Sequence, residues 1–175
     1  MKAQRSLVKL KTLTELPAMV TLKSSGGSRT SVDLICVIDN SGSMQGEKIN
    51  LVKETIKFLL ETLTPSDRLS IITFNSYGSR LCGLKCVTGE NMQTFKNIVE
   101  NINAGGGTNI NSGLQLALKT MRDRKHINKV TSIFLLSDGQ DKGAEFTFQQ
   151  SLTNPINNEL GVFTLHSFGF GTDHD

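Results

Sequence analysis

Apolar and polar positions repeat with two different periods along the chain, which predicts strands interleaved with helices. Residues 32–39 form an almost unbroken apolar run, as expected for a parallel strand that is covered on both faces. Residues 47–63 instead carry apolar side chains at helical spacing and end before Thr64 and Pro65. The same criteria predict strands over 68–74, 80–87, 130–136 and 162–168, and helices with apolar faces within 92–102, 110–121 and 145–152.

This alternation indicates an α/β fold with a doubly wound, mostly parallel open sheet and helices on both faces. The turn at Gly78 is tight, so we expect the strand over 80–87 to be antiparallel and to lie at the sheet edge. Ligands of such sheets bind beyond the carboxyl ends of the strands. Asp39 and Asp138 sit at the carboxyl ends of two of the predicted strands and therefore point to one common face.

Three polar loops offer hard oxygen ligands at this face. They are residues 39–43, 105–109 and 137–139. Alternate residues of an extended loop project to the same side, and a run of glycines lets a backbone pass close to another group. Carboxylates, hydroxyls and waters together suit Mg²⁺, which takes six oxygens. The candidate metal ligands are Asp39, Ser41, Ser43, Thr108 and Asp138.

Each loop also has a simpler interpretation. Ser41 or Ser43 could cap the helix that begins at Glu47, and Thr108 or Asn109 could cap the next one. Asp138 could belong to an ordinary turn after its strand. The three loops in this order, on neighbouring strand ends, favour a shared site over three unrelated caps and turns.

Residues 31–175 resemble the von Willebrand factor A (VWA) family, which has a Rossmann-like fold. The segments that carry the resemblance are 39–44, 106–114 and 136–139. The resemblance implies a metal-ion-dependent adhesion site (MIDAS) in which Ser41 and Ser43 bind the metal through their hydroxyls. It implies that Thr108 binds directly or through water, and that Asp39 and Asp138 act mainly through water or hydrogen bonds.

The implied function is a metal-dependent protein-binding module without a catalytic residue. It would present Mg²⁺, or alternatively Mn²⁺ or Ca²⁺, to a Glu or Asp carboxylate of a partner protein. The nearer resemblance is to intracellular VWA domains such as those of plant RING-type ubiquitin ligases. No RING-like cysteine pairs are present, so ligase activity is not implied.

The resemblance divides the chain into an N-terminal extension, residues 1–30 with short strands, and a VWA domain over residues 31–175. The chain stops where full VWA domains add a further helix and strand, so we expect a truncated C-terminal element. This would expose apolar side chains of the last strand, Phe163, Leu165 or Phe168, and favour association. We also expect other domains in a longer parent protein.

Two other functions stay open on the sequence alone. One is a Mg²⁺-dependent phosphohydrolase with Asp39 as nucleophile, although Ser41 stands where a second carboxylate would be needed. The other is a structural domain with an unused metal site. His166 lies in an apolar strand and is interpreted as a core residue, so no Ser/His/Asp set is predicted.

Composition and cysteine spacing bear on the possible partners of the protein and on its cellular compartment. The net charge of +3 comes from 19 basic and 16 acidic residues, too small and dispersed an excess for nucleic-acid binding. No apolar stretch approaches the roughly 18 residues of a membrane span. Cys82 and Cys86 would lie roughly 13 Å apart in a strand, too far for a disulfide. With Cys36 in the apolar run, we expect reduced cysteines and a cytoplasmic protein.

Overall fold

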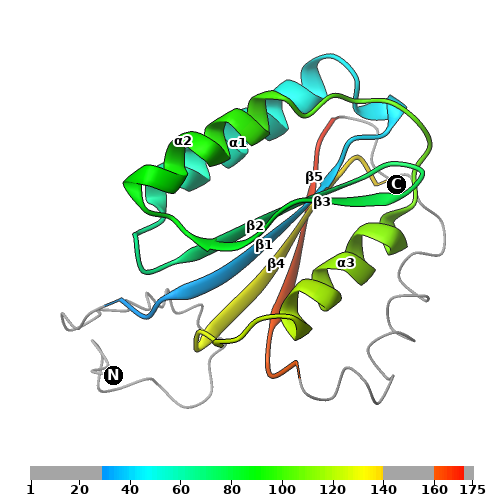
Figure 1. The fold of residues 1–175 in the computed structure, drawn as a ribbon. Coiled ribbons are helices and arrows are strands. Elements are labelled where there is room, and N and C mark those ends of the chain that lie inside the picture. The colour runs from blue at the N-terminus through cyan, green and yellow to red at the C-terminus, as the bar shows by residue number, and fades with distance from the viewer. Residues whose placement is uncertain (1–28, 140–159, 172–175) are drawn as a thin grey trace, which may run out of the picture.

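The fold is a five-stranded sheet between two helical layers. The computed structural model describes residues 29–139 and 160–171 (Figure 1). Its elements are β1 (Val32–Asp39), the 3-10 turn η1 (Gly42–Met44), α1 (Glu47–Thr62), β2 (Arg68–Phe74), β3 (Gly78–Cys86), α2 (Gly89–Glu100), α3 (Ile110–Arg122), β4 (Val130–Ser137) and β5 (Thr164–Gly169).

The strand order is β3-β2-β1-β4-β5, with β1 at the centre. β1 pairs in parallel with β2 and β4, and β4 pairs in parallel with β5. β3 is antiparallel to β2 at one edge. α1 and α2 cover one face of the sheet and α3 covers the other (Figure 1). The predicted fold class is therefore confirmed.

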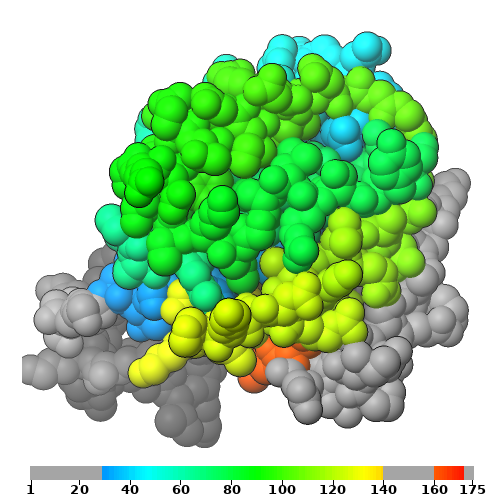
Figure 2. All heavy atoms as spheres, in the orientation of Figure 1, coloured from blue at the N-terminus to red at the C-terminus, as the bar shows by residue number. Residues whose placement is uncertain are grey.

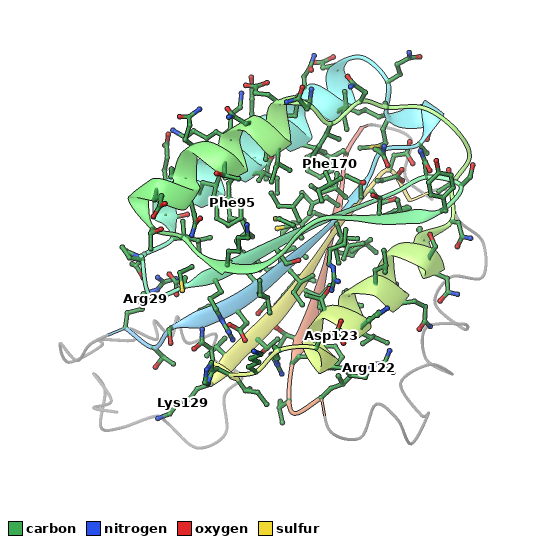
Figure 3. All side chains as sticks on the ribbon, viewed as in Figure 1. Arg29, Phe95, Arg122, Asp123, Lys129 and Phe170 are labelled. Carbon is green, nitrogen blue, oxygen red and sulfur yellow. The ribbon has the colours of Figure 1, made fainter. Side chains whose placement is uncertain are left out.

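β1 supplies side chains to two separate cores because successive residues of a strand point to opposite faces. Cys36 and Ile38 pack with α1 and α2, while Ile35 and Val37 pack with α3. This double burial explains the unbroken apolar run. Figure 3 shows Phe95 of α2 in the first of these layers, where it is almost fully buried. Figure 2 shows α2, β3 and α3 closing this side of the molecule.

The amino ends of the strands are joined by buried charges. Asp33 is fully buried and accepts hydrogen bonds from Arg68 Nε at 2.7 Å and Arg124 Nη1 at 3.1 Å. Asp67 accepts from the backbone N–H groups of Val32 at 2.9 Å and Thr64 at 2.7 Å. These carboxylates therefore stabilise the end of the sheet opposite to the predicted site.

The predicted elements agree closely with the observed ones. β1 and β2 have the expected bounds, and β3 begins two residues earlier than expected. The helix expected over 145–152 and the short strands expected within 1–30 lie outside the described residues. Among the described residues, no helix has the length and apolar character needed to cross a membrane.

One interpretation, that of His166 as a core residue, is wrong. The His166 side chain is exposed on β5, at the sheet edge opposite to β3. Its ring meets the Phe134 ring edge-on and its Nε2 lies 3.1 Å from the Thr164 hydroxyl. Leu165 and Phe168 of the same strand are also exposed.

Cys36 and Cys82 are buried free thiols, and Cys86 is an exposed free thiol.

Candidate metal site

The last residue of β1 buries its carboxylate at the carboxyl end of the sheet. Asp39 is fully buried. Its Oδ1 accepts a hydrogen bond from the Ser41 backbone N–H at 2.9 Å, and its Oδ2 accepts one from the Ser137 hydroxyl at 2.9 Å. The Asn40 N–H donates to the Phe74 carbonyl at 2.9 Å, which fixes the loop to the end of β2. The Asp39 side chain is thus held rigidly.

The Ser41 and Ser43 hydroxyls lie side by side, and neither caps α1. Their oxygens are 3.0 Å apart, with Ser41 buried and Ser43 exposed. The N-cap of α1 is Gly46, at φ 84°, with no side-chain hydrogen bond. The interpretation of Ser41 or Ser43 as the α1 cap is therefore wrong, and neither hydroxyl is committed to that role.

The glycine-rich loop is fastened to both neighbouring loops. Gly42 N–H donates to the Gly106 carbonyl at 3.0 Å, and Gly107 N–H donates to the Ser76 hydroxyl at 3.0 Å. Gly106 has φ 86°, which favours glycine. In Figure 2, blue atoms of the segment after β1 appear between the green atoms of these loops. The backbone therefore brings the second loop to the first.

Thr108 follows this glycine loop and is half-buried. The cap of α3 is the next residue, Asn109, whose side chain accepts from the Ser112 N–H at 3.0 Å. Among the described residues, the Thr108 hydroxyl makes no hydrogen bond. The capping interpretation is thus confirmed for Asn109, and the Thr108 hydroxyl remains available to a ligand.

Asp138 follows β4 and is buried, at 1% exposure. Its Oδ2 accepts a hydrogen bond from Lys48 Nζ at 3.0 Å, whereas its Oδ1 is buried and has no hydrogen-bond partner among the residues that the structure describes. Burial raises the pKa of Asp39, and the negative charge of Asp138 raises it further against the hydrogen bonds from Ser41 and Ser137. The fold therefore brings two carboxylates from distant loops close together.

These residues fit a hard divalent cation. Two buried carboxylates face only one described cationic side chain, Lys48, and an unpartnered buried oxygen of Asp138 is costly without a ligand or water. Within the described ranges, no three or more His, Cys, Asp or Glu side chains are gathered as a metal-binding group. A cation here would need hydroxyls and waters in addition to the two carboxylates, and Mg²⁺ usually keeps several waters and binds through one or two carboxylates.

Sequence reasoning missed two residues that touch the candidate carboxylates. Ser137 binds Asp39, and its signal was a hydroxyl at the end of an apolar strand, directly before Asp138. Lys48 binds Asp138 from the first turn of α1. No spacing signals this contact, because the two residues meet only after α1 folds over the end of β4.

Comparison with known proteins agrees with this architecture. The model of the von Willebrand factor type A domain family matches residues 34–140, more than half of the chain. The E3 ubiquitin-protein ligase WAV3 of Arabidopsis thaliana is 35% identical over 81% of this chain and 20% of its own length. Inter-alpha-trypsin inhibitor heavy chain H1 of Mesocricetus auratus is 32% identical over 83% of this chain and 16% of its own.

A solved structure shares the fold. The von Willebrand factor type A protein from Catenulispora acidiphila superposes with a TM-score of 0.69 at 22% identity, over 83% of this chain and 34% of that one. The chain thus spans about a fifth or less of the curated relatives described above. The family match over more than half of the chain and the identity to these relatives show that the chain belongs to the von Willebrand factor type A domain family.

Proposed function

We propose that this domain binds a protein partner by presenting Mg²⁺ to a Glu or Asp carboxylate of that partner. VWA domains typically mediate protein–protein interactions and often depend on a metal. The observation that carries the proposal is the buried Asp138 Oδ1, which has no partner within the described part of the chain and lies near the second buried carboxylate, Asp39. A structural domain with an unused site has no need of such an unsatisfied oxygen.

The proposed ligands would leave the metal positively charged. Ser41, Ser43 and Thr108 contribute neutral hydroxyls, while Asp39 and Asp138 act through water or hydrogen bonds. Because the ligands that touch the ion carry no charge, the ion keeps its attraction for an anion. A partner carboxylate supplies the hard oxygen that completes six-coordination. Mn²⁺ would serve similarly, and Ca²⁺ is a weaker alternative because it takes more ligands.

The burial of Asp39 argues against the phosphohydrolase alternative. A nucleophilic carboxylate must reach its substrate, but Asp39 is fully buried and both of its oxygens accept hydrogen bonds. The ligase named among the relatives is about five times longer than the stretch matched here. We therefore propose that this chain is a partner-binding region of a longer, cytoplasmic protein rather than an enzyme by itself.

Metal titration tests the proposed ligands. Isothermal titration with Mn²⁺ should detect one site per chain, and Thr108→Ala should weaken it about tenfold or more, the effect of losing about 1.4 kcal/mol. Thr55→Ala is the matched control, because that hydroxyl binds the Leu51 carbonyl on an exposed face of α1. Equal Mn²⁺ affinity in the parent and Thr108→Ala would contradict the ligand assignment.

Partner capture tests the docking chemistry. Binding should require Mg²⁺ or Mn²⁺ and disappear in EDTA. It should also disappear when one particular partner carboxylate is changed to its amide. A partner that binds equally in EDTA, or that tolerates every such change, would show that docking occurs elsewhere on the domain.

A further inference from the structure

Lys48 differs from the other lysines of α1 in where its ammonium lies. Lys53 donates to the Glu100 carbonyl, and Lys57 pairs with the exposed Glu100 side chain. Lys48 instead reaches a carboxylate that is 1% exposed, with its own side chain 23% exposed. It therefore places a positive charge inside the candidate metal site.

The position is unfavourable for α1 itself. Lys48 lies in the first turn of the helix, directly after Glu47, where the helix dipole disfavours cations. Good helix formation therefore does not explain a cation here. The compensating interaction is the ion pair with Asp138, at 3.0 Å.

The segment after β5 lies beside Lys48. Phe170 N–H donates to the Ser137 carbonyl at 3.1 Å, which ties this segment to the end of β4. A Cβ on Gly171 would lie 2.8 Å from Lys48 Cε, and Gly171 has φ 115°. The positive φ favours glycine here, and the lack of a side chain leaves room for the lysine stem beside it. Figure 3 shows Phe170 between the sheet and the layer of α1 and α2.

We propose that Lys48 is a built-in counter-cation that orients Asp138 when no metal is bound and lowers the affinity of the site for divalent cations. The inference rests on the function proposed for this site. Asp39 and Asp138 bring two negative charges, and Lys48 offsets one of them. A divalent ion near Asp138 must approach this ammonium, and like charges in a partly buried site repel strongly. Lys48 therefore tunes the metal occupancy of the site.

The test compares Mn²⁺ affinity between charge variants. Lys48→Met should bind Mn²⁺ about tenfold more tightly than the parent, a gain of about 1.4 kcal/mol. Lys48→Arg keeps the charge and should bind like the parent. Lys53→Met removes one charge from the same helix, where the ammonium binds the Glu100 carbonyl of α2 rather than Asp138, and should also leave the affinity unchanged. In EDTA, Lys48→Met should melt below the parent, because two buried carboxylates then lack their counter-ion.

The outcomes separate this inference from the proposed function. If the parent binds Mn²⁺, Asp138→Asn loses it and Lys48→Met binds no more tightly than the parent, the role of Lys48 is refuted while the metal site stands. If neither the parent nor Lys48→Met binds Mn²⁺, both proposals fail. Should Lys48→Met not fold in EDTA, Lys48→Gln retains a hydrogen-bond donor without the charge and carries the same comparison.

Discussion

Asp39→Asn should stabilise the metal-free protein but leave it less stable than the parent when Mg²⁺ is bound. Asp39 is fully buried, and burial raises its pKa, with a further contribution from the negative charge of Asp138. The charged form therefore destabilises the metal-free fold. Asparagine preserves the shape, because its oxygen can accept from the Ser41 N–H and its amide can donate to the Ser137 hydroxyl.

The order of stability of the parent and Asp39→Asn should reverse between metal-free and Mg²⁺-saturated conditions. Without metal, Asp39→Asn should be more stable than the parent by about 0.5–2 kcal/mol, the usual gain of a single stabilising substitution. At Mg²⁺ about a hundredfold above its Kd, the parent should gain about 2.7 kcal/mol and the variant little. For a chain of 175 residues, each kcal/mol shifts Tm by about 2–4 °C. The parent Tm should therefore rise by about 5–11 °C and overtake the variant.

The pH dependence of the metal-free proteins follows from the same carboxylate. A raised folded pKa means that the stabilising contribution of Asp39 is present below the unfolded pKa and is lost as pH rises through the folded pKa. The advantage of Asp39→Asn in EDTA should therefore grow from acidic to neutral pH.

Thermal denaturation followed by circular dichroism, in EDTA and across a Mg²⁺ titration, measures both effects. Asp67→Asn is the matched control at the other end of the sheet, where it should lower Tm in both media and keep the full Mg²⁺ gain. A lower Tm of Asp39→Asn than of the parent in EDTA would refute the argument from burial. An undiminished Mg²⁺ gain in Asp39→Asn would refute its place in the metal site.

Two further predictions concern the opposite end of the sheet. Asp33→Asn leaves Arg68 and Arg124 without their buried counter-ion. It should lower the free energy of unfolding, measured by urea denaturation, by about 3–5 kcal/mol and leave the stabilisation by Mg²⁺ unchanged. A loss below about 1 kcal/mol would contradict this role of Asp33. Burial alone would raise the pKa of Asp67, but hydrogen bonds, chiefly from Thr64 and Val32, lower it. The charged Asp67 carboxylate therefore stabilises the fold above its unfolded pKa, and this stabilisation is lost as pH falls toward its folded pKa. The Tm of the parent should drop below about pH 4 more steeply than the Tm of Asp67→Asn. Equal dependence of Tm on pH in the two proteins would count against this role of Asp67.

Much of the fold was predictable because the spacing of apolar residues along a short segment distinguishes a strand from a helix. The run over 32–39 predicted a strand buried on both faces, and β1 has these bounds. The same reasoning placed Asp39 and Asp138 at carboxyl ends of parallel strands, where the sheet brings them together. That the candidate residues bind a metal stays a prediction. That Asp39 and Asp138 lie close together was expected from the order of the strands alone.

Local patterns alone determined the elements of this protein, their order and the polar character of its three loops, because each depends on residues close in the chain. Only the tertiary structure decided which groups meet. An apolar pattern cannot tell a central strand from an edge strand, so His166 was misplaced in the core. A serine before a helix resembles a cap until the backbone shows that Gly46 holds that position. The contact of Lys48 with Asp138 joins residues 90 apart in sequence, and it exists because α1 folds across the end of β4.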